Sequence, residues 1–169
     1  IRPYLEATAE TLDALPFMLH DFGYRGASSQ ETAAIGGLAH LVNSMGTDTV
    51  SALLLAQEYY GAETAVGVSV AATEHSVMTS LGESGEFNVV EQLLAGYPQG
   101  ILSVVADSYD IYRFVKRIGS LYRAQIMERD GVFVVRPDSV TPEDPTPHEL
   151  VAWILARLWQ DFGGEINSK

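Results

Sequence analysis

The sequence predicts an α/β fold built from about five consecutive βα units. Short apolar runs rich in β-branched residues recur along the chain, as expected of buried parallel strands. Each run ends in a cluster of polar residues, and a stretch with helix-start signals follows it. The repeat fits an open doubly wound sheet and a portion of an eight-unit barrel equally well, and the period alone does not distinguish them.

The strands are predicted from apolar runs that are too short for helices. Connections between parallel strands are right-handed, so the polar clusters that follow the strands meet at one edge of the sheet. That carboxyl edge is where α/β sheets and barrels bind their ligands. The predicted strands are residues 17–19, 41–42, 66–70, 101–105 and 132–135.

Helix-start and helix-stop residues separate these strands. Ser28 and Glu31 have the spacing of a capping box. Thr146 and Glu149 form a second one, with a proline at the first helical position. The predicted helices are one after Ser28 and those at about 49–60, 86–95, 108–119, 121–128 and 147–162, with loops at 82–85 and 138–147.

The composition excludes several classes of function. Acidic residues outnumber basic ones 22 to 10, and the formal net charge of -12 argues against a nucleic-acid partner. The absence of cysteine excludes disulfides, thiolate nucleophiles and cysteine-ligated metals. No apolar run approaches the roughly 18 residues of a membrane span, so we expect no membrane partner. The absence of cysteine fits a reducing compartment, and we expect a cytoplasmic protein. The chain opens without Met and without a signal-peptide core, so we expect residues 1–169 to be one α/β portion of a longer chain.

The richest candidate site follows the first predicted strand. Arg25 offers a planar guanidinium suited to phosphate oxygens, just before a predicted helix amino end. Phe22 offers a flat face to an aromatic ring, and Gly23 allows a ligand to approach the backbone closely. The competing interpretation pairs Arg25 with Asp21 and places the aromatic side chains in the core.

Two further strand ends carry Asp48 and His75. Asp48 is either a helix cap or a carboxylate that accepts a hydrogen bond from a ligand amide. His75 is either structural or a general acid–base group that can also carry positive charge toward a phosphate. His20 is a further candidate for the site, whereas His40 and His148 are predicted to be structural.

The last two strand ends carry Asp107, Arg136 and Asp138. Asp107 either caps a helix or holds a ribose hydroxyl or a metal-bound water. Arg136 and Asp138 lie two residues apart on an extended segment, so their side chains project the same way. An arginine for phosphate beside an aspartate for a sugar diol suits a nucleotide, and the alternative is a salt bridge between the two. The chain lacks GxGxxG, GxxxxGK(S/T) and GxSxG, which removes the usual support for Rossmann, P-loop and α/β-hydrolase functions.

Four segments together carry a family resemblance. They read HDFGYRGASSQETAAIGGLAHLVNSMGTDT at 20–49, SVAATEHS at 69–76, SVVADSYDIY at 103–112 and RPDS at 136–139. In content and order they resemble the nicotinamide phosphoribosyltransferases of the type II phosphoribosyltransferase family. The resemblance spans essentially the whole chain.

This resemblance implies a central fragment of a larger homodimeric enzyme. Such an enzyme has an α/β barrel, a smaller domain and active sites at the subunit interface. It joins nicotinamide to phosphoribosyl pyrophosphate, releasing pyrophosphate and nicotinamide mononucleotide for NAD salvage. It uses Mg2+ with phosphoribosyl pyrophosphate and couples to ATP hydrolysis through a phosphorylated histidine. The N-terminal and C-terminal parts of the parent enzyme are then absent from 1–169, the type II barrel is incomplete, and we expect the fragment alone to be inactive.

The resemblance also implies roles for residues at the motif positions. His75 is the implied catalytic, phosphorylated histidine, and it binds diphosphate together with Arg25 and Arg136. Asp48 is implied to receive the nicotinamide carboxamide, and no residue is implied as a direct metal ligand. Phe22 is implied to stack on the pyridine ring, and both Asp107 and Asp138 to lie near the ribose, with Asp107 also near the metal. The other implied substrate-binding residues are Ser69, Val70 and Ala72, which line the ring pocket, and Ser103.

Two positions depart from the family pattern, and two other functions stay open. Val140 stands where a glycine is expected after RPDS, and Ala71 where a proline is expected before the His75 segment. The enzymatic alternative is a nicotinate phosphoribosyltransferase, against which Asp48 argues because it would repel the nicotinate carboxylate. The other alternative is a non-catalytic barrel fragment that acts as an assembly module.

Overall fold

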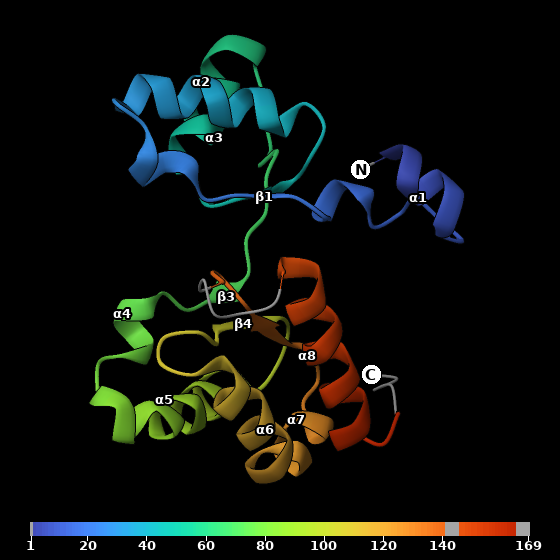
Figure 1. Ribbon diagram of the computed structural model, residues 1–169. Helices are drawn as coiled ribbons and strands as arrows, with labels where there is room; N and C mark the ends of the chain where they lie inside the picture. The colour runs from blue at the N-terminus through green and yellow to red at the C-terminus, as the bar shows by residue number, and fades with distance from the viewer. Residues whose placement is uncertain (1, 141–145, 165–169) are drawn as a thin grey trace. The chain divides into compact units, whose positions relative to one another are not determined.

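The computed structural model describes residues 2–140 and 146–164. The chain divides into two compact units, Ile1–Ser69 and Val70–Lys169, and each contains its own parallel sheet (Figure 1). The predicted α/β class and the parallel strands are therefore confirmed. No helix in the described part of the chain is long and apolar enough to cross a membrane.

The first unit contains a short parallel strand pair and two packed helices. β1 (His20–Asp21) pairs with β2 (Gly46–Thr47). α2 (Gln30–Leu41) packs along α3 (Val50–Tyr60), as Figure 1 shows. The remaining elements are α1 (Arg2–Thr8) and the 3-10 turns η1 (Leu15–Phe17) and η2 (Gly23–Gly26).

Two predicted strands of this unit are wrong. The run 17–19 begins in the 3-10 turn η1, and the strand starts only at His20. The run 41–42 closes α2, and the chain enters the sheet only at Gly46. A run of two or three apolar residues shows no period, so it does not distinguish a strand from a helix end.

The termini of the two helices are set by local side-chain chemistry. The N-cap of α2 is Ser29 rather than the predicted Ser28, and its hydroxyl accepts a 3.1 Å hydrogen bond from the Thr32 amide. The predicted stop of α3 is confirmed: Gly61 follows with φ 63, a left-handed conformation that favours glycine.

The second unit is a three-stranded parallel sheet with a helical cover. β4 (Leu102–Val105) is buried throughout and lies between β3 (Ala71–Ala72) and β5 (Phe133–Arg136). The predicted strands 101–105 and 132–135 are confirmed, whereas within 66–70 only Val68 pairs, in a bridge. The helices are α4 (His75–Met78), α5 (Gly82–Gly96), α6 (Ile111–Leu121), α7 (Arg123–Glu128) and α8 (Pro147–Asp161).

The first residues of α5 and α6 differ from the prediction, whereas the start of α8 agrees with it. Residues 82–85 are the first turn of α5, not a loop. The N-cap of α6 is Asp110, whose carboxylate accepts a 2.9 Å hydrogen bond from the Arg113 amide, so Asp107 is not the cap. The capping box that opens α8 at Thr146 is present as predicted. The predicted loop 138–147 falls partly outside the described residues.

A buried carboxylate ties α5 to α6. Glu86 is 0% exposed, and it accepts a 3.1 Å hydrogen bond from Arg113, which also pairs with Glu83. Burial raises the pKa of Glu86 above its ordinary value, and the hydrogen bond and charge of Arg113 offset only part of that effect. The helix predicted at about 86–95 begins at Glu86, but the sequence does not indicate that this carboxylate is buried.

Adjacent glycines of α2 provide a test of the helix packing. A Cβ at Gly37 would lie 2.8 Å from the Ala52 Cβ and 3.0 Å from the Thr49 Cγ2, whereas a Cβ at Gly36 meets nothing within 4 Å. We predict that Gly37→Ala lowers the free energy of unfolding by about 1–3 kcal/mol through overpacking. Gly36→Ala should raise it by up to about 1 kcal/mol because alanine favours the helix. Urea denaturation followed by circular dichroism measures both, and equal effects would contradict this packing of α2 on α3.

Candidate functional site

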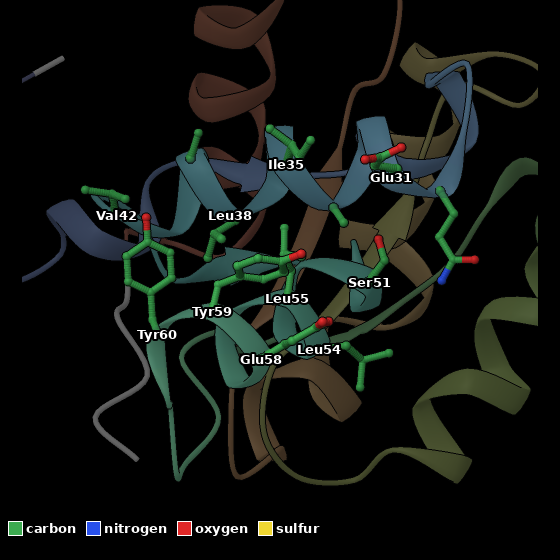
Figure 2. A pocket seen from close by; sticks show the side chains of 13 residues that line it. Glu31, Ile35, Leu38, Val42, Ser51, Leu54, Leu55, Glu58, Tyr59 and Tyr60 are labelled. Carbon is green, nitrogen blue, oxygen red and sulfur yellow. The ribbon is translucent and has the colours of Figure 1, made fainter.

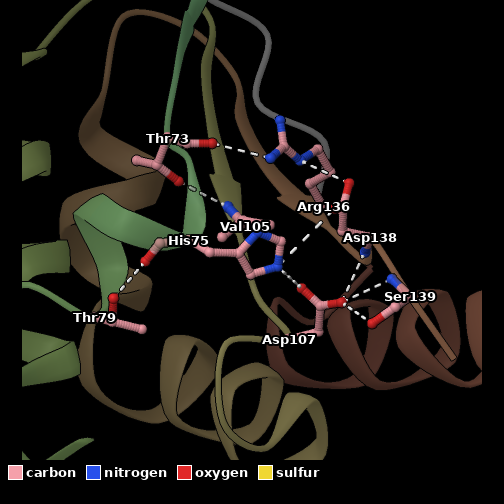
Figure 3. A network of polar contacts seen from close by, with 8 residues as sticks. All are labelled: Thr73, His75, Thr79, Val105, Asp107, Arg136, Asp138 and Ser139. Atoms are coloured by element: carbon pink, nitrogen blue, oxygen red, sulfur yellow. Dashed lines mark hydrogen bonds and ion pairs between the residues drawn. The ribbon is translucent and has the colours of Figure 1, made fainter. Parts of the chain in front are cut away.

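Polar side chains gather at the carboxyl ends of the three strands of the second unit (Figure 3). His75 follows β3, Asp107 follows β4, and Asp138 follows β5, of which Arg136 is the last residue. Because the strands are parallel, these ends lie at one edge of the sheet. The structure therefore brings together four of the predicted site residues in one hydrogen-bonded and ion-paired network.

Asp107 is the centre of this network. Its side chain is 8% exposed, and its Oδ2 accepts hydrogen bonds from the Ser139 amide and hydroxyl, both at 2.7 Å, and from the Asp138 amide at 3.2 Å. Burial by itself would raise the pKa of the Asp107 carboxyl. The Ser139 hydrogen bonds and the charge of His75 outweigh burial, so this pKa lies below its ordinary value. Asp107 is consequently an ionised carboxylate at neutral pH.

His75 faces this carboxylate from the first turn of α4. Its Nε2 lies 3.2 Å from Asp107 Oδ1 and 4.0 Å from Asp138 Oδ2, and its side chain is 44% exposed. An ionised carboxylate only accepts hydrogen bonds, so Nε2 carries a proton. In the neutral ring the lone pair is then on Nδ1, which makes that nitrogen the candidate base or nucleophile.

Arg136 is held by the backbone of the neighbouring strand end. Its Nη2 donates a 3.0 Å hydrogen bond to the Thr73 carbonyl, and its Nε lies 3.7 Å from Asp138 Oδ1. The Thr73 hydroxyl in turn accepts a 2.9 Å hydrogen bond from the Val105 amide. The predicted Arg136–Asp138 proximity is therefore observed, and the salt-bridge interpretation of the pair holds in this structure.

Three further predicted residues lie on or just before the strands of this unit. Ala72 is exposed and pairs in register with Ser103, which is 9% exposed in β4. The Ser103 carbonyl accepts a 2.9 Å hydrogen bond from the Thr73 amide. Val70 precedes β3 and is 38% exposed. Ser103 therefore lies buried in the central strand, whereas Ala72 and Val70 remain accessible.

The first unit holds a second carboxylate–imidazole pair at its strand ends. Asp48 follows β2, its Oδ1 lies 3.2 Å from His20 Nε2, and it also accepts a hydrogen bond from the Ser69 hydroxyl. The Thr49 amide donates to the Thr47 hydroxyl at 3.0 Å, and within the described residues α3 has no side-chain cap. The helix-cap interpretation of Asp48 is therefore wrong, and its 39% exposed side chain belongs to the strand-end group.

Phe22 and Arg25 follow β1 in the same unit. The Phe22 ring is 49% exposed and stacks on the His20 ring with centroids 4.4 Å apart, so the core interpretation of this aromatic is wrong. The Asp21 carboxylate accepts a 2.8 Å hydrogen bond from the Gly23 amide and thereby shapes the turn. Arg25 is exposed in η2, shortly before the amino end of α2.

A large apolar groove lies apart from these residues. Figure 2 shows it between α2 and α3, lined by Ile35, Leu38, Leu54 and Tyr59 among others. None of the predicted site residues lines it. In this chain the candidate site is identified by its polar chemistry rather than by the size of a cavity.

The sequence does not predict two residues of the network, Thr73 and Ser139. Thr73 is one residue beyond β3 and Ser139 is three residues beyond β5. A hydroxyl side chain shortly after a strand is the only signal in the sequence that could have suggested them. His40 is structural as predicted, with Nε2 2.8 Å from the Gly46 carbonyl. Among the described residues, no group of three or more histidine, aspartate or glutamate side chains is arranged to hold a metal ion.

Comparison with known proteins identifies the protein family to which the chain belongs. Residues 17–169 match the model of the nicotinate phosphoribosyltransferase (NAPRTase) family. The chain belongs to the nicotinate phosphoribosyltransferase family, which confirms the type II phosphoribosyltransferase resemblance.

Particular relatives carry a more specific name. The chain is similar to proteins named nicotinamide phosphoribosyltransferase from Xanthomonas campestris pv. campestris (strain 8004), at 43% identity over 173 residues, and from Acinetobacter baylyi, at 36% over 183 residues. A protein of the same name from Mycoplasma pneumoniae is 31% identical over 174 residues. These alignments cover 100%, 98% and 98% of this chain, but only 36% of each relative. The chain therefore spans about a third of the length of these relatives.

The lowered pKa of Asp107 predicts a pH-dependent contribution to stability. A carboxylate with a folded pKa below its unfolded value stabilises the fold above the unfolded pKa and loses that contribution as pH falls through the folded pKa. Asp107→Asn should therefore lower the free energy of unfolding most at neutral pH, and the difference from the natural chain should shrink below about pH 4. Urea denaturation across a pH series measures this difference.

The matched control is Asp130→Asn. Asp130 is also in the second unit, but its side chain is exposed. The free energy of unfolding of Asp130→Asn should equal that of the natural chain at every pH. If the difference in unfolding free energy between Asp107→Asn and the natural chain did not change with pH, the hydrogen-bonded Asp107 carboxylate would be contradicted.

Proposed function

We propose that this chain is the central α/β-barrel portion of a nicotinamide phosphoribosyltransferase. The observation that carries the proposal is the strand-end network of Asp107, His75, Arg136 and Asp138, in a chain similar to relatives of that name. Cationic and hydrogen-bonding groups at the carboxyl edge of parallel strands suit a phosphorylated sugar. The whole of 1–169 then forms one part of the barrel in the longer enzyme.

The reaction is a displacement at the anomeric carbon of phosphoribosyl pyrophosphate. The ring nitrogen of nicotinamide forms the new bond to C1, the bond from C1 to the pyrophosphate oxygen breaks, and pyrophosphate leaves with the bonding electrons. Positive charge grows on the sugar while negative charge grows on the leaving group. Arg25, Arg136 and His75 would stabilise the diphosphate, and fixed charges aimed at developing charge lower the barrier.

The remaining site residues would bind nicotinamide and ribose. Phe22 would stack on the pyridine ring, and Asp48 would accept a hydrogen bond from the carboxamide. The exposure of both side chains supports these roles. Asp107 and Asp138 would lie near the ribose hydroxyls. The ring pocket would be completed by Ser69, Val70, Ala72 and Ser103.

Mg2+ would arrive with the diphosphate of the substrate. Magnesium prefers oxygen ligands and is commonly bound through substrate phosphates and few carboxylates. The donor set agrees with this, because Asp107 Oδ2 is already taken by three hydrogen bonds and Asp138 is the more exposed carboxylate. The metal would neutralise charge on the diphosphate, while the residues of this chain orient it.

ATP would act as the coupling nucleotide, with His75 as the residue that accepts its γ-phosphoryl group. Support comes from the 44% exposed imidazole and from Asp107, which holds the proton on Nε2 and leaves Nδ1 as the attacking nitrogen. In that step the Nδ1–P bond forms and the bond from the γ-phosphorus to the bridging oxygen breaks, which releases ADP.

The proposed setting is a cytoplasmic homodimer with active sites at the subunit interface, working in NAD salvage. The direct test mixes the protein, at the full length of its relatives, with nicotinamide, phosphoribosyl pyrophosphate and Mg2+. Nicotinamide mononucleotide and pyrophosphate should form in equal amounts, and residues 1–169 alone should form none. Titration calorimetry of nicotinamide should show binding that depends on phosphoribosyl pyrophosphate. Full-length protein without binding or product would instead favour an assembly module.

Asp48 would determine the choice between nicotinamide and nicotinate. A nicotinate carboxylate about 4 Å from Asp48 is disfavoured by about 1 kcal/mol in water and about 4 kcal/mol at an effective dielectric near 20. The exposure of Asp48 places the effect between these limits. We predict that Asp48→Ser narrows the preference for nicotinamide over nicotinate by roughly one order of magnitude or more, measured as the ratio of kcat/KM values.

The control for this prediction is Glu58→Ser in the full-length protein. Glu58 lines the groove between α2 and α3 and is exposed. Its replacement should leave the ratio of kcat/KM values unchanged. An unchanged ratio in Asp48→Ser would refute the role of Asp48 in selecting the amide.

A further inference from the structure

Ser139 contacts the central carboxylate of the network twice. Its backbone amide and its hydroxyl both donate 2.7 Å hydrogen bonds to the same oxygen, Asp107 Oδ2 (Figure 3). Ser139 follows β5 and Asp107 follows β4, so these bonds join two strand ends. The Ser139 side chain is itself exposed, and burial in a core does not account for a serine at this position.

The contacts on Oδ2 determine the direction of the other oxygen. A carboxylate turns about one bond, so donors that hold Oδ2 also aim Oδ1. Asp107 Oδ1 is the atom that lies 3.2 Å from His75 Nε2. Three donors from residues after β5 hold Oδ2 in the described part of the chain, namely the amides of Asp138 and Ser139 and the Ser139 hydroxyl. The hydroxyl is the one donor of the three that a side-chain substitution removes.

We propose that Ser139 is a positioning residue that acts through Asp107 to hold the proton of His75 on Nε2 and to keep Nδ1 available as the reactive nitrogen. The chain of contacts runs from the Ser139 hydroxyl to Asp107 Oδ2, and from Asp107 Oδ1 to His75 Nε2. This inference rests on the proposed function for the reactivity of Nδ1. The orientation of the imidazole proton is independent of that function and can be measured without turnover.

Two other polar groups near His75, Asp138 and Thr79, do not hold the proton on the imidazole Nε2. Asp138 Oδ2 is 4.0 Å from Nε2, beyond hydrogen-bond distance, and Asp138 also faces Arg136 at 3.7 Å. The Thr79 hydroxyl donates to the backbone carbonyl of His75 and does not reach the ring through that bond. The oriented partner of the ring is therefore Asp107, and its orientation is what Ser139 would control.

The first measurement is the tautomer of His75 in the 169-residue protein. Nitrogen-15 NMR of the ring, at a pH where His75 is neutral, should show the Nε2–H form as the major species in the natural chain. Ser139→Ala should shift the population toward Nδ1–H, and Ser139→Thr, which keeps the hydroxyl, should restore it. Ser80→Ala is the matched control, because the Ser80 hydroxyl donates to the Val77 carbonyl and, among the described residues, has no hydrogen bond to His75 or Asp107.

The second measurement is turnover in the protein at the full length of its relatives. Loss of partners that orient metal-bound histidines lowers activity roughly 10- to 100-fold. Two amide donors remain on Asp107, so we expect kcat of Ser139→Ala to fall about tenfold, at the lower end of that range. KM should change little, and Ser139→Thr should restore kcat.

The two measurements separate the positioning role from the proposed function. Failure of the full-length natural protein to form nicotinamide mononucleotide would overturn the proposed function, while the tautomer ratio would still test Ser139. A tautomer ratio that is the same in Ser139→Ala as in the natural chain would overturn the positioning role, whatever the turnover. A fall in kcat that Ser139→Thr does not restore would also count against it.

Discussion

The carboxylate of Asp107 is the constraint on which the strand-end network depends. A carboxylate that is 8% exposed is tolerated only when donors and positive charge surround it. The backbone after β5 therefore turns so that the amides of Asp138 and Ser139 point at Oδ2. This turn sets the place of Asp138, and hence its distance from Arg136 and His75. One buried charge thus fixes the relative positions of groups from three strand ends.

The two units use the same local arrangement with different degrees of burial. In each, an aspartate one or two residues after a strand lies 3.2 Å from a histidine Nε2 and accepts a hydrogen bond from a serine hydroxyl. The side chain of Asp107 is 8% exposed, whereas that of Asp48 is 39% exposed. A buried, fully hydrogen-bonded carboxylate is suited to orienting a neighbour. An exposed one keeps the capacity to accept a hydrogen bond from a ligand, which matches the division of roles that we propose.

The sequence predicts the parallel strands and the residues at their ends better than it predicts the helix caps. β4 and β5 are found because each contains a clear apolar run: β4 is buried throughout, and the residues of β5 are partly buried. β1 and β2 have only two residues each, and pairing of the backbone rather than side-chain hydrophobicity defines them. Asp48 and Asp107 look like caps from sequence because aspartate before a helix usually is one. In the structure these two aspartates instead accept hydrogen bonds from Ser69 and Ser139, which are distant in sequence, so the local pattern does not show them.

The electrostatics of the network bear on how a polyanion could bind to so acidic a chain. The formal net charge is -12, and at the strand ends two carboxylates face one guanidinium and one imidazole. With His75 neutral, this group is net negative and would repel a diphosphate. Attraction of a diphosphate then requires protonation of His75 or a cation that travels with the substrate. A magnesium-bound diphosphate would satisfy the second condition without a protein ligand cluster, which agrees with the three hydrogen bonds that already engage Asp107 Oδ2.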